Sequence, residues 1–526
     1  MTWPGRLAMQ ARLARDAPAF LRTTMGSAQA VEILRRQLTD REGRFLTVVR
    51  ETVYAHPRSP YRALLEEARC TFEDLRELVT REGLEAALSA LVAAGVYVTF
   101  DEFKGRKTVV RGSRPFQFTD ADFDNPRVSP HLEATSGGTR GAPTSVKMSL
   151  AFVADQAVGT ALALDAHGLN RHAHVIWLVA GGMPLLMYAK LGRPPLAWLS
   201  TMKRVPVQMA AGARVLAALG RLQGCPLPRP MFHDLADPAG LVAWLHRVTR
   251  DGTSICVTTY ASSAVRVCVA AAERGVSLER VCFITLGEPY TEAKQRLVRA
   301  VGARALVRYA FTEGGIVGYG CAEPRDPDDL HLLANSLAVV RRSREVGHRD
   351  VRVDALLMTS LLAESPKVLL NVESGDYARV EDRPCACALG AAGLTRHVAS
   401  VRSFEKLSSE GMTFVRADLV RVLEEVLPGR FGGTSVDYQV VEEESRNGIL
   451  QVSLIVSPAV GRIDEDAARE ALLGELERNG GLERVSIWRR AGTVRVRRQR
   501  PVATNAGKIL PFHLVRESGS GRMSHL

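Results

Sequence analysis

Residues 134–144 read ATSGGTRGAPT, and this stretch is the starting point for interpreting the rest of the chain. Three glycines, three threonines, a serine and a proline in eleven residues suit neither a helix nor a strand, so we expect a loop. A loop rich in hydroxyls and exposed backbone N–H groups can wrap a polyphosphate. A plain surface loop between two elements has the same composition, and the stretch alone does not decide between the two.

The composition is that of a globular protein with a basic excess. The chain has 526 residues, of which 46% are hydrophobic and 24% charged, with a formal charge of +12. This length suffices for about two to four domains. The charge favours an anionic partner, such as a nucleotide, coenzyme phosphates or an acidic protein, although it is also common as a solubility feature. Eight scattered cysteines predict no disulfide framework and a reducing cytoplasm.

No stretch predicts a secretory signal or a membrane span. The first twenty residues, MTWPGRLAMQARLARDAPAF, contain no uninterrupted apolar core. The most apolar segment, Val175–Ala189, is short and broken by Gly-Gly and Pro. We expect it to form a buried strand, a turn and the next element.

Periodicity divides the chain into three parts. Residues 1–130 predict helices, most clearly Val31–Ala55 and Thr71–Ala94, with an irregular polar passage at Asp101–Asp124. From residue 145 to about 375, short apolar runs alternate with helical stretches, which predicts α/β layering, and we expect residues 131–402 to form the core of the large domain. The expected strands there include Ile255–Thr259, Val281–Thr285 and Ala305–Tyr309, and the expected helices include Ser262–Arg274 and Glu292–Val301.

Residues 403–526 predict a separate, small α+β domain. The expected helices are Asp418–Val426 and Asp464–Asn479. The expected strands are Val436–Glu442, Ile449–Val456, Arg484–Trp488 and Thr493–Val496, and Arg516–Leu526 predicts a frayed tail.

The segment YAFTEGG, residues 309–315, follows an expected strand. The Tyr309 ring can cover an adenine, the Thr312 hydroxyl can reach a phosphate, and the Glu313 carboxylate can hold Mg²⁺. The alternative is an N-cap threonine with a helix-start glutamate.

Two further short motifs carry a carboxylate and an amine. Glu373-Ser374-Gly375-Asp376 closes the apolar run Val368–Val372, and an aspartate just past a strand can accept hydrogen bonds from both ribose hydroxyls. The alternative is a turn aspartate. In Thr504–Ile509 (TNAGKI), Lys508 follows a small-residue turn and can project into another domain's cleft, or it is a solvated surface lysine.

The order of these four features resembles the adenylate-forming superfamily of acyl-CoA ligases, acyl-AMP ligases and adenylation domains. The similarity covers most of residues 130–515 and is greatest to the phenylacetate–CoA ligase-like branch. Residues 136–144 are similar to that branch's loop, with Pro-Thr where relatives have Pro-Lys. Phe283–Pro289 (FITLGEP) is similar to its Gly-Glu-Pro segment, and the stretch from Val401 through Phe414 resembles its domain junction.

The resemblance implies a fold and an activity. The fold is a large N-terminal adenylate-forming domain of several subdomains plus a small mobile C-terminal α+β domain. The activity is reaction of a carboxylic acid, aryl or otherwise hydrophobic, with MgATP to give acyl-AMP and pyrophosphate, followed by transfer to a thiol such as coenzyme A. The alternatives are an acyl-AMP ligase that serves a carrier protein or an amine, and a degenerate non-catalytic nucleotide-binding member.

The resemblance also assigns roles to residues. Tyr309 would lie against adenine, Thr312 would contact phosphate and Glu313 would bind Mg²⁺. Lys508 would bridge the substrate carboxylate and the α-phosphate, where negative charge accumulates in the transition state. The remaining ATP-binding positions would be Ser136, Gly137, Gly138, Thr139, Gly141, Thr144, Gly287, Glu288, Pro289, Asp376 and Arg402, the last two at the ribose.

Three residues depart from the family's pattern. Arg140 stands where relatives have a hydroxyl or a small residue in the loop. Ala310 replaces a common glycine and brings a methyl group to the expected floor of the substrate pocket. Phe404 occupies the usual acidic or lysine hinge position, which makes the hinge rotation less secure than the adenylation step.

Cys321, His331, Cys385 and Cys387 form a candidate metal set. The branch that the chain resembles often has a Cys, a His and a C-x-C at these places, which implies structural Zn²⁺ in a closed tetrahedral site. The alternative is buried thiols and a surface histidine. We expect the other cysteines to be apolar core residues: Cys70, Cys225, Cys256, Cys268 and Cys282.

Six arginines gather in the segments Trp488–Arg490 and Arg495–Arg500. On a strand they could receive the phosphates of coenzyme A or an acidic carrier protein, or they form a solvated face. Sparse aromatic residues argue against nucleic acid. We expect no membrane partner and leave a homodimer open.

Overall fold

The structure is a computed structural model in which the chain forms two compact units. The larger unit comprises Met1–Gly138, Ala142–Arg344 and Asp354–Arg402, and the smaller comprises Thr139–Gly141, Glu345–Val353 and Ser403–Leu526. The residues described below are 3–112, 114–135, 145–179, 181–202, 207–234, 237–346, 352–404, 408–409, 412–413, 418–444, 450–478, 488–489, 494–504 and 507–515.

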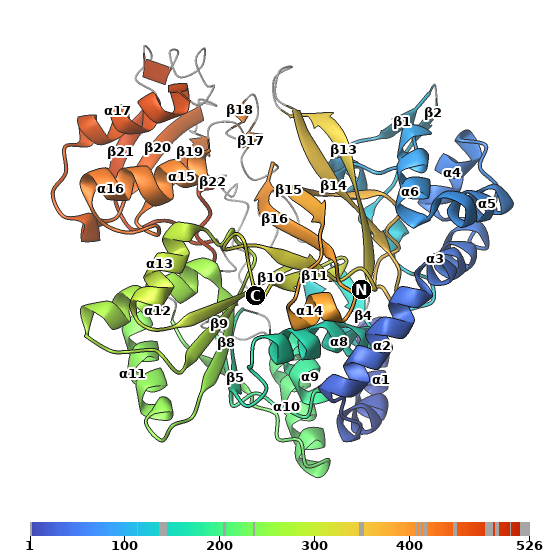
Figure 1. Cartoon of the computed structure of the whole chain (residues 1–526), viewed down its shortest axis with the longest axis horizontal. Helices are drawn as coiled ribbons and strands as arrows, with labels where there is room; N and C mark the ends of the chain where they lie inside the picture. Colours follow the sequence, from blue (N-terminus) through green and yellow to red (C-terminus); the bar gives the residue numbers. More distant parts are fainter. Residues whose placement is uncertain are drawn as a thin grey trace. The chain divides into compact units, whose positions relative to one another are not determined.

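The N-terminal part of the larger unit is helical, as expected (Figure 1). The expected helix Val31–Ala55 is interrupted at Asp40, and Thr71–Ala94 is interrupted at Gly83. Thr71 caps the start of the helix Phe72–Glu82 with a capping box: its hydroxyl accepts the Asp74 N–H, and the Asp74 carboxylate accepts the Thr71 N–H. The helices are α1 (Trp3–Arg22), α2 (Ser27–Thr39), α3 (Arg41–Val49), the π-helix η1 (Arg50–Tyr54), α4 (Pro60–Glu67), α5 (Phe72–Glu82) and α6 (Leu84–Ala93).

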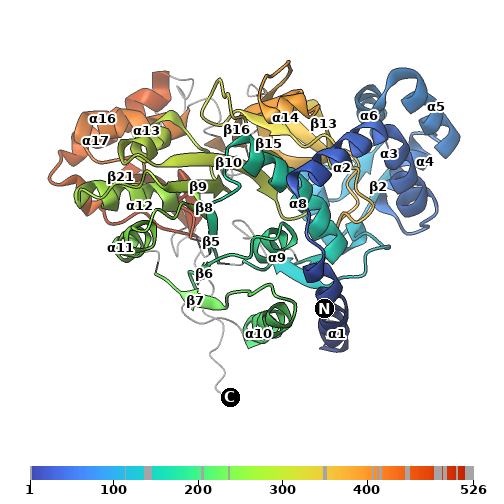
Figure 2. The same ribbon diagram turned by 60° about the horizontal axis from the view of Figure 1, so that its bottom comes forward.

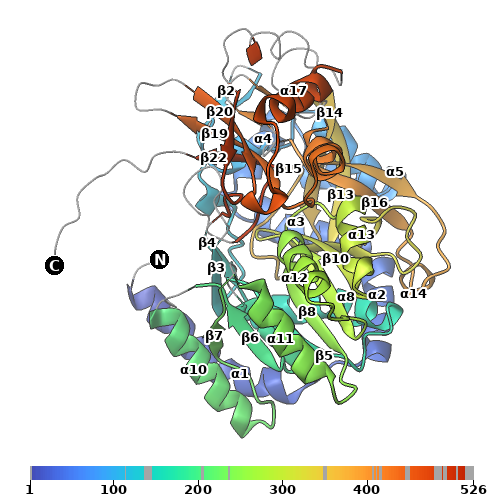
Figure 3. The same cartoon turned by 90° about the vertical axis from the view of Figure 1, so that its left-hand side faces the viewer.

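Twelve of the described strands form one sheet, of which half is parallel. The parallel strands lie in the order β7 (Pro230–Phe232), β6 (Ala197–Ser200), β5 (Ala173–Trp177), β8 (Ile255–Tyr260), β9 (Val281–Leu286) and β10 (Arg304–Phe311). The helices between and before them are α8 (Leu150–Ala166), α9 (Gly182–Lys190), α10 (Val207–Leu222), α11 (Pro238–Thr249), α12 (Ala261–Glu273) and α13 (Glu292–Ala300). Figures 2 and 3 show α11, α12 and α13 side by side along this half of the sheet.

The other half of the sheet continues from β10 with antiparallel pairing. Its order is β11 (Gly315–Gly320), β12 (Leu330–Leu332), β16 (Arg396–Ser403), β15 (Val372–Asp382), β14 (Arg352–Ser360) and β13 (Leu337–Glu345). One apolar core joins these strands to the N-terminal helices, and a second fills the space between the parallel strands and α11–α13. The short elements around them are α7 (Phe100–Phe103), β1 (Val109–Arg111), β2 (Arg114–Phe116), η2 (Asp120–Phe123), β3 (Leu132–Thr135), β4 (Ser145–Met148) and α14 (Ala388–Ala391).

The smaller unit contains a four-stranded sheet in the order β21 (Val494–Arg498), β20 (Leu450–Val456), β19 (Tyr438–Glu444) and β22 (Phe512–Val515). Apolar side chains from these strands and from the helices of the unit form its core. Its other elements are β17 (Ser408–Ser409), β18 (Met412–Thr413), α15 (Leu419–Arg421), η3 (Val422–Val426), α16 (Leu427–Phe431), η4 (Pro458–Val460) and α17 (Glu465–Leu476). The expected tail Arg516–Leu526 and most of the expected strand Arg484–Trp488 lie outside the described residues.

The predicted fold class is confirmed, because the larger unit layers helices on a mixed sheet and the smaller is α+β. None of the helices in the described part of the chain combines the length and apolarity that crossing a membrane requires.

Candidate functional site

The polar motifs of the larger unit gather where strands β8, β9 and β10 end. Tyr260 of β8 and Arg308 of β10 both pair with Leu286, the last residue of β9. Parallel strands direct their carboxyl ends to one edge, and this edge is where α/β sheets bind ligands. The segments that follow the three strands therefore share one side of the sheet.

The segment Gly287-Glu288-Pro289 follows β9 directly and holds the start of a helix. The Glu288 carboxylate accepts hydrogen bonds from the Ser262 N–H (2.6 Å) and the Ser262 hydroxyl (2.9 Å) in the first turn of α12. The Pro289 carbonyl accepts one from the Lys294 ammonium at 2.9 Å. A carboxylate at a helix N-terminus is favoured by the helix dipole. The role of Gly287, Glu288 and Pro289 in binding ATP stays a prediction.

Thr312 and Glu313 form the tight turn between β10 and β11. The chain reverses here into an antiparallel strand, so the alternative of an N-cap threonine at the start of a helix is wrong. The Ile316 N–H just beyond the turn donates to the buried Gln156 Oε1 at 2.7 Å, which ties the turn to α8.

Glu313 is 8% exposed and pairs with Lys104, the residue that follows α7. Sequence reasoning missed Lys104, because a lysine in the polar passage Asp101–Asp124 carries no sign of a partner two hundred residues away. The one available signal was the capping pattern of Thr99 and Glu102, which predicts a short helix before the lysine.

Tyr309 and Asp376 meet directly. The Tyr309 hydroxyl donates to Asp376 Oδ2 at 2.7 Å, and burial followed by the Asp376 charge raises the tyrosine pKa well above its usual value. Tyr309 is therefore a neutral donor beside a carboxylate. The structure thus brings together the two residues to which the resemblance assigns the adenine and the ribose.

The expected position of Asp376 just past a strand is wrong. Residues 372–382 form one strand, β15, so the motif opens a strand rather than closing one. Pairing with β14 shifts register between Ala355 and Leu357, opposite Glu373–Tyr377, and Gly375 has φ +81° inside this bulge. Glycine tolerates that conformation, and the bulge turns the following aspartate out of the regular pleat.

Arg402 is held by an acidic side chain of its own unit. Its Nη1 donates to Asp328 Oδ2 at 3.1 Å, while Asp328 Oδ1 accepts the Ser400 N–H at 3.1 Å. The predicted contact of Arg402 with a ribose stays a prediction.

Lys508 sits in a tight loop of the smaller unit. The Gly507 N–H donates to the Thr504 carbonyl (2.7 Å), the Thr504 N–H to the Lys508 carbonyl (2.8 Å) and the Lys508 N–H to the Thr504 hydroxyl (3.1 Å). Gly507 has φ +85°, which a residue with a Cβ rarely adopts. This geometry fits the expected small-residue turn before the lysine.

Gln439 fastens this loop to the sheet, and sequence reasoning missed it. Its side chain is fully buried in β19. Nε2 donates to the carbonyls of Val502 (3.0 Å) and Leu510 (2.8 Å), and Oε1 accepts the Val502 N–H at 2.7 Å. The amide therefore holds the chain on both sides of Lys508.

Of the three residues that depart from the family pattern, the structure describes Phe404 and Ala310. Phe404 is 1% exposed, so the hinge position carries a core side chain. Ala310 lies in β10 at an irregularity in the pairing with β11. Arg140 and the predicted phosphate loop, Ser136–Thr144, lie outside the described residues, and their roles stay predictions.

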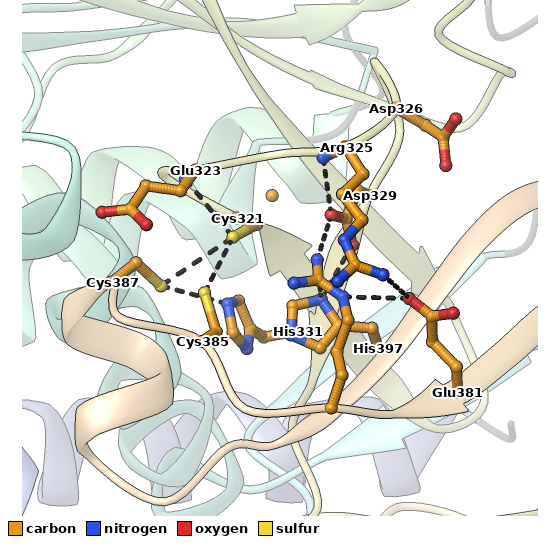
Figure 4. A network of polar contacts seen from close by, with 12 residues as sticks. Cys321, Glu323, Arg325, Asp326, Asp329, His331, Glu381, Cys385, Cys387 and His397 are labelled. Atoms are coloured by element: carbon orange, nitrogen blue, oxygen red, sulfur yellow. Dashed lines mark hydrogen bonds and ion pairs between the residues drawn. The ribbon is translucent and has the colours of Figure 1, made fainter.

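Cys321, His331, Cys385 and Cys387 converge, with one ligand atom from each lying within 4.8 Å of every other (Figure 4). Cys321 Sγ is 3.5 Å from Cys385 Sγ and 3.9 Å from Cys387 Sγ, and Cys387 Sγ is 3.1 Å from His331 Nε2. Thiolates on one tetrahedral zinc ion, with bonds of about 2.3 Å, stand about 3.8 Å apart. The four residues therefore fit a metal ion of this kind.

Neighbouring groups prepare two members of this cluster for a metal. His331 Nδ1 lies 2.6 Å from the Leu394 carbonyl, which fixes the tautomer that leaves Nε2 free to coordinate. Burial lowers the His331 pKa to about 4, so the ring is neutral. Burial opposes ionisation of Cys387, but backbone N–H groups and the Cys385 thiol bring its pKa below the usual value. The predicted surface histidine of the alternative is wrong, since His331 is fully buried.

A second group consists of Asp329 and His397 with Cys321, which it shares with the first. Both carboxylate oxygens of Asp329 already have partners: Oδ1 lies 2.8 Å from His397 Nδ1, and Oδ2 accepts the Arg325 N–H at 2.9 Å. His397 packs on His331 with ring centroids 4.0 Å apart. This group therefore supports the cysteine–histidine cluster from outside.

The remaining cysteines follow the expectation with one exception. Cys225, Cys256, Cys268 and Cys282 are buried, as predicted. Cys70 is half-buried between α4 and α5, where its carbonyl accepts the Tyr54 hydroxyl at 3.0 Å.

Three of the six arginines are engaged within their own unit. Arg497 pairs with Glu443 at 2.6 Å, and Arg498 donates to the Ser457 carbonyl at 3.2 Å. Arg489 pairs with Glu470 and Glu477. These contacts favour the solvated face among the two expectations, and a role in binding phosphates is not tested by them.

The mixed sheet and the α+β unit have the fold of the adenylate-forming enzymes, as the likeness to a solved structure shows. The solved structure of 2-hydroxyisobutyryl-CoA ligase, captured in the postadenylation state with an acyl-AMP ligand, is similar at a TM-score of 0.54 and 16% identity, over 94% of this chain and 91% of that one.

Two other solved structures have lower TM-scores. ATP-bound MatB from Rhodopseudomonas palustris has 13% identity over 90% of this chain and 91% of that one, with a TM-score of 0.43. The amide bond synthetase McbA from Marinactinospora thermotolerans has 13% identity over 90% and 92%, also at 0.43. At these scores neither supports a further argument. No protein-family model and no curated protein matches the sequence.

Proposed function

We propose that this protein activates a carboxylic acid with ATP, forming acyl-AMP and pyrophosphate, and then transfers the acyl group to a thiol, with coenzyme A as the first choice. The observation that carries the proposal is the placement of Glu313 in the turn after β10, the strand that carries Tyr309, whose hydroxyl donates to Asp376 of β15. The carboxylate proposed to bind the metal ion therefore follows directly the strand that carries Tyr309, the aromatic member of the proposed nucleoside-binding pair.

The proposed chemistry assigns one task to each group. A carboxylate oxygen of the acid attacks the α-phosphorus of ATP, the bond to pyrophosphate breaks, and the mixed anhydride forms. Glu313 would hold Mg²⁺, which neutralises the departing phosphates. Asp376 would accept hydrogen bonds from the ribose, and Lys508, from the smaller unit, would stabilise the charge on the α-phosphate. A mobile smaller unit is part of this proposal.

The proposal is less specific about the acceptor of the acyl group and about the identity of the carboxylic acid. Coenzyme A is supported by the name of the similar 2-hydroxyisobutyryl-CoA ligase. Transfer to a carrier protein or an amine is the alternative, and a non-catalytic nucleotide-binding member is disfavoured by the intact Glu313, Asp376 and Lys508. An aryl or other hydrophobic acid follows from the sequence resemblance alone, as do a cytoplasmic location and a possible homodimer.

Carboxylate-dependent exchange of pyrophosphate into ATP tests the first half-reaction across a panel of acids. If exchange occurs, thioester formation with coenzyme A tests the second. Exchange without a thioester would favour the carrier-protein or amine acceptor.

We further propose that the cluster of Cys321, His331, Cys385 and Cys387 binds structural Zn²⁺. The fit of three thiols and one neutral imidazole supports this assignment. A closed site of this kind stabilises the fold and supplies no chemistry. The cluster also supports the phenylacetate–CoA ligase-like branch, in which such a set is common.

A further inference from the structure

Lys104 follows the short helix α7, whose N-terminal capping groups are paired. The Thr99 N–H donates to Glu102 Oε2 at 2.8 Å, and the Glu102 N–H donates to the Thr99 hydroxyl at 3.4 Å. Glu102 also receives both terminal nitrogens of Arg111, at 3.0 and 3.1 Å. A capping box reinforced by a bidentate ion pair fixes the direction of α7.

Two further contacts fix the position of α7. The Phe100 N–H donates to Glu373 at 3.4 Å, and Glu373, with no exposed side-chain surface, is itself paired with Arg342 at 2.9 Å. The Phe103 side chain is 3% exposed and packs on Phe123 with ring centroids 4.6 Å apart. These contacts therefore fix the position of Lys104, which follows the helix.

The ammonium of Lys104 contacts Glu313 Oε1 in a nearly dry setting. The two side chains are 11% and 10% exposed. The Lys104 nitrogen also lies 5.7 Å from the Phe100 ring centroid and 5.5 Å from that of Phe103. Rings and burial keep water from the cation, so its interactions with nearby anions are strong.

The proposed function places the phosphates of ATP close to the Lys104 ammonium. A metal ion bound by Glu313 would also bind phosphate oxygens, which places the polyphosphate within a few ångströms of the same carboxylate. The charge of ATP exceeds that of one Mg²⁺ ion, so further cations are needed. Lys508 belongs to the smaller unit, whereas Lys104 belongs to the unit that carries Glu313.

We propose that Lys104 binds the polyphosphate of MgATP as well as Glu313, and so is a second lysine of the nucleotide site. This inference rests on the proposed function, because it requires an ATP site at Glu313. The competing explanation is structural: Lys104 only neutralises a buried carboxylate. Both explanations predict lower stability when Lys104 alone is changed, so stability does not separate them.

A double-mutant comparison separates them. We would measure the binding of MgATP and of adenosine by calorimetry to the full-length wild type, Lys104→Met, Glu313→Gln and the double variant. Lys107→Met is the matched control, since Lys107 lies three residues further on and is exposed. Adenosine has no phosphate and reports on the integrity of the nucleoside site.

The proposal expects Lys104→Met to raise the Kd of MgATP at least about tenfold, the lower end of the loss for a charge-assisted hydrogen bond, with unchanged adenosine affinity. It also expects the double variant to bind MgATP about tenfold more weakly than Glu313→Gln alone, and Lys107→Met to bind like wild type.

Equal MgATP affinity of the double variant and Glu313→Gln would overturn the proposal, even if pyrophosphate exchange by the wild type upholds the enzyme assignment. Parallel loss of adenosine binding would overturn it as well, because it indicates a structural role. Absence of MgATP binding by the wild type would overturn both this proposal and the proposed function.

Discussion

The Tyr309 hydroxyl lies 2.7 Å from Asp376 Oδ2, joining strand β10 to strand β15. These residues are 67 positions apart in the chain. The strands that carry them are not neighbours in the sheet, since β11, β12 and β16 lie between them in the strand order. A nucleoside bound at this edge would therefore meet an aromatic ring and a carboxylate that are already fixed relative to each other.

Removing this hydroxyl tests the pair. Tyr309→Phe removes the hydroxyl that donates to Asp376, and we expect the KM for ATP to rise at least about tenfold, the lower end of the range for losing one hydrogen bond to a charged group. Tyr319→Phe is the matched control. It removes a buried hydroxyl from β11, the strand next to β10, and this hydroxyl lies 2.8 Å from the Thr160 hydroxyl of α8. Equal effects of the two substitutions on KM would contradict the assignment.

Lys508 is predicted to act only in the chemical step. Lys508→Ala should reduce acid-dependent pyrophosphate exchange by at least about a hundredfold, since it removes a cation from the charged transition state. Binding of MgATP, measured by calorimetry, should change little. Undiminished exchange in this variant would refute the role of Lys508.

Gln439 is predicted to act through the loop that it holds. Gln439→Leu leaves two carbonyls and one N–H without their buried partner, so we expect looser placement of Lys508 and a severalfold loss of exchange. MgATP affinity should be retained. Ser453→Ala, a buried polar change in the adjacent strand, serves as the control. Exchange at the wild-type level in Gln439→Leu would show that the loop keeps its shape without the amide.

The cysteine–histidine cluster is predicted to hold about one zinc ion per chain when the protein is purified without chelator. Cys385→Ser and His331→Ala should each lower the zinc content and the apparent Tm, whereas Cys70→Ser, at a half-buried thiol outside the cluster, should change neither. Elemental analysis and thermal unfolding measure both. Less than about half an equivalent in the wild type would count against the site.

Asp155 in α8 gives the stability a pH dependence. Burial raises its pKa to about 6, although Arg44 and Gln37 partly oppose this. Because the folded-state pKa lies above the unfolded value, ionisation costs stability, which is lost as the pH rises from about 4 to above 6. Asp155→Asn should therefore raise the apparent Tm at pH 8 by a few degrees and leave it nearly unchanged at pH 4.

Thermal unfolding at both pH values measures this difference. Asp165→Asn, at an exposed position of the same helix, is the control and should show no such pH-dependent gain. A gain for Asp155→Asn at pH 4 as large as that at pH 8 would show that the carboxylate does not titrate as described.

The sequence was most informative where a local pattern determines the structure. Strands β8, β9 and β10 and helices α12 and α13 lie within one or two residues of their predicted bounds, because short apolar runs between helical stretches have few other arrangements. The thiols at 321, 385 and 387 were grouped correctly through the resemblance, and the C-x-C spacing was the local sign.

Long-range partners were beyond the reach of local patterns. The contacts of Lys104 with Glu313 and of Gln439 with Val502 and Leu510 depend on how distant segments pack. The strand position of Asp376 was missed because the bulge at Gly375 follows from pairing with β14, and a glycine before an aspartate reads equally well as a turn. Helix breaks at Asp40 and Gly83 were visible only as single residues inside long periodic runs.

Acid-dependent ATP–pyrophosphate exchange tests the central claim most directly. With MgATP and a broad panel of aryl, aryl-acetic and aliphatic acids, we predict exchange with at least one acid, and its loss in Glu313→Gln and Lys508→Ala. Absence of exchange with every acid, from protein that binds MgATP, would contradict the assignment of this chain as an acid-activating enzyme.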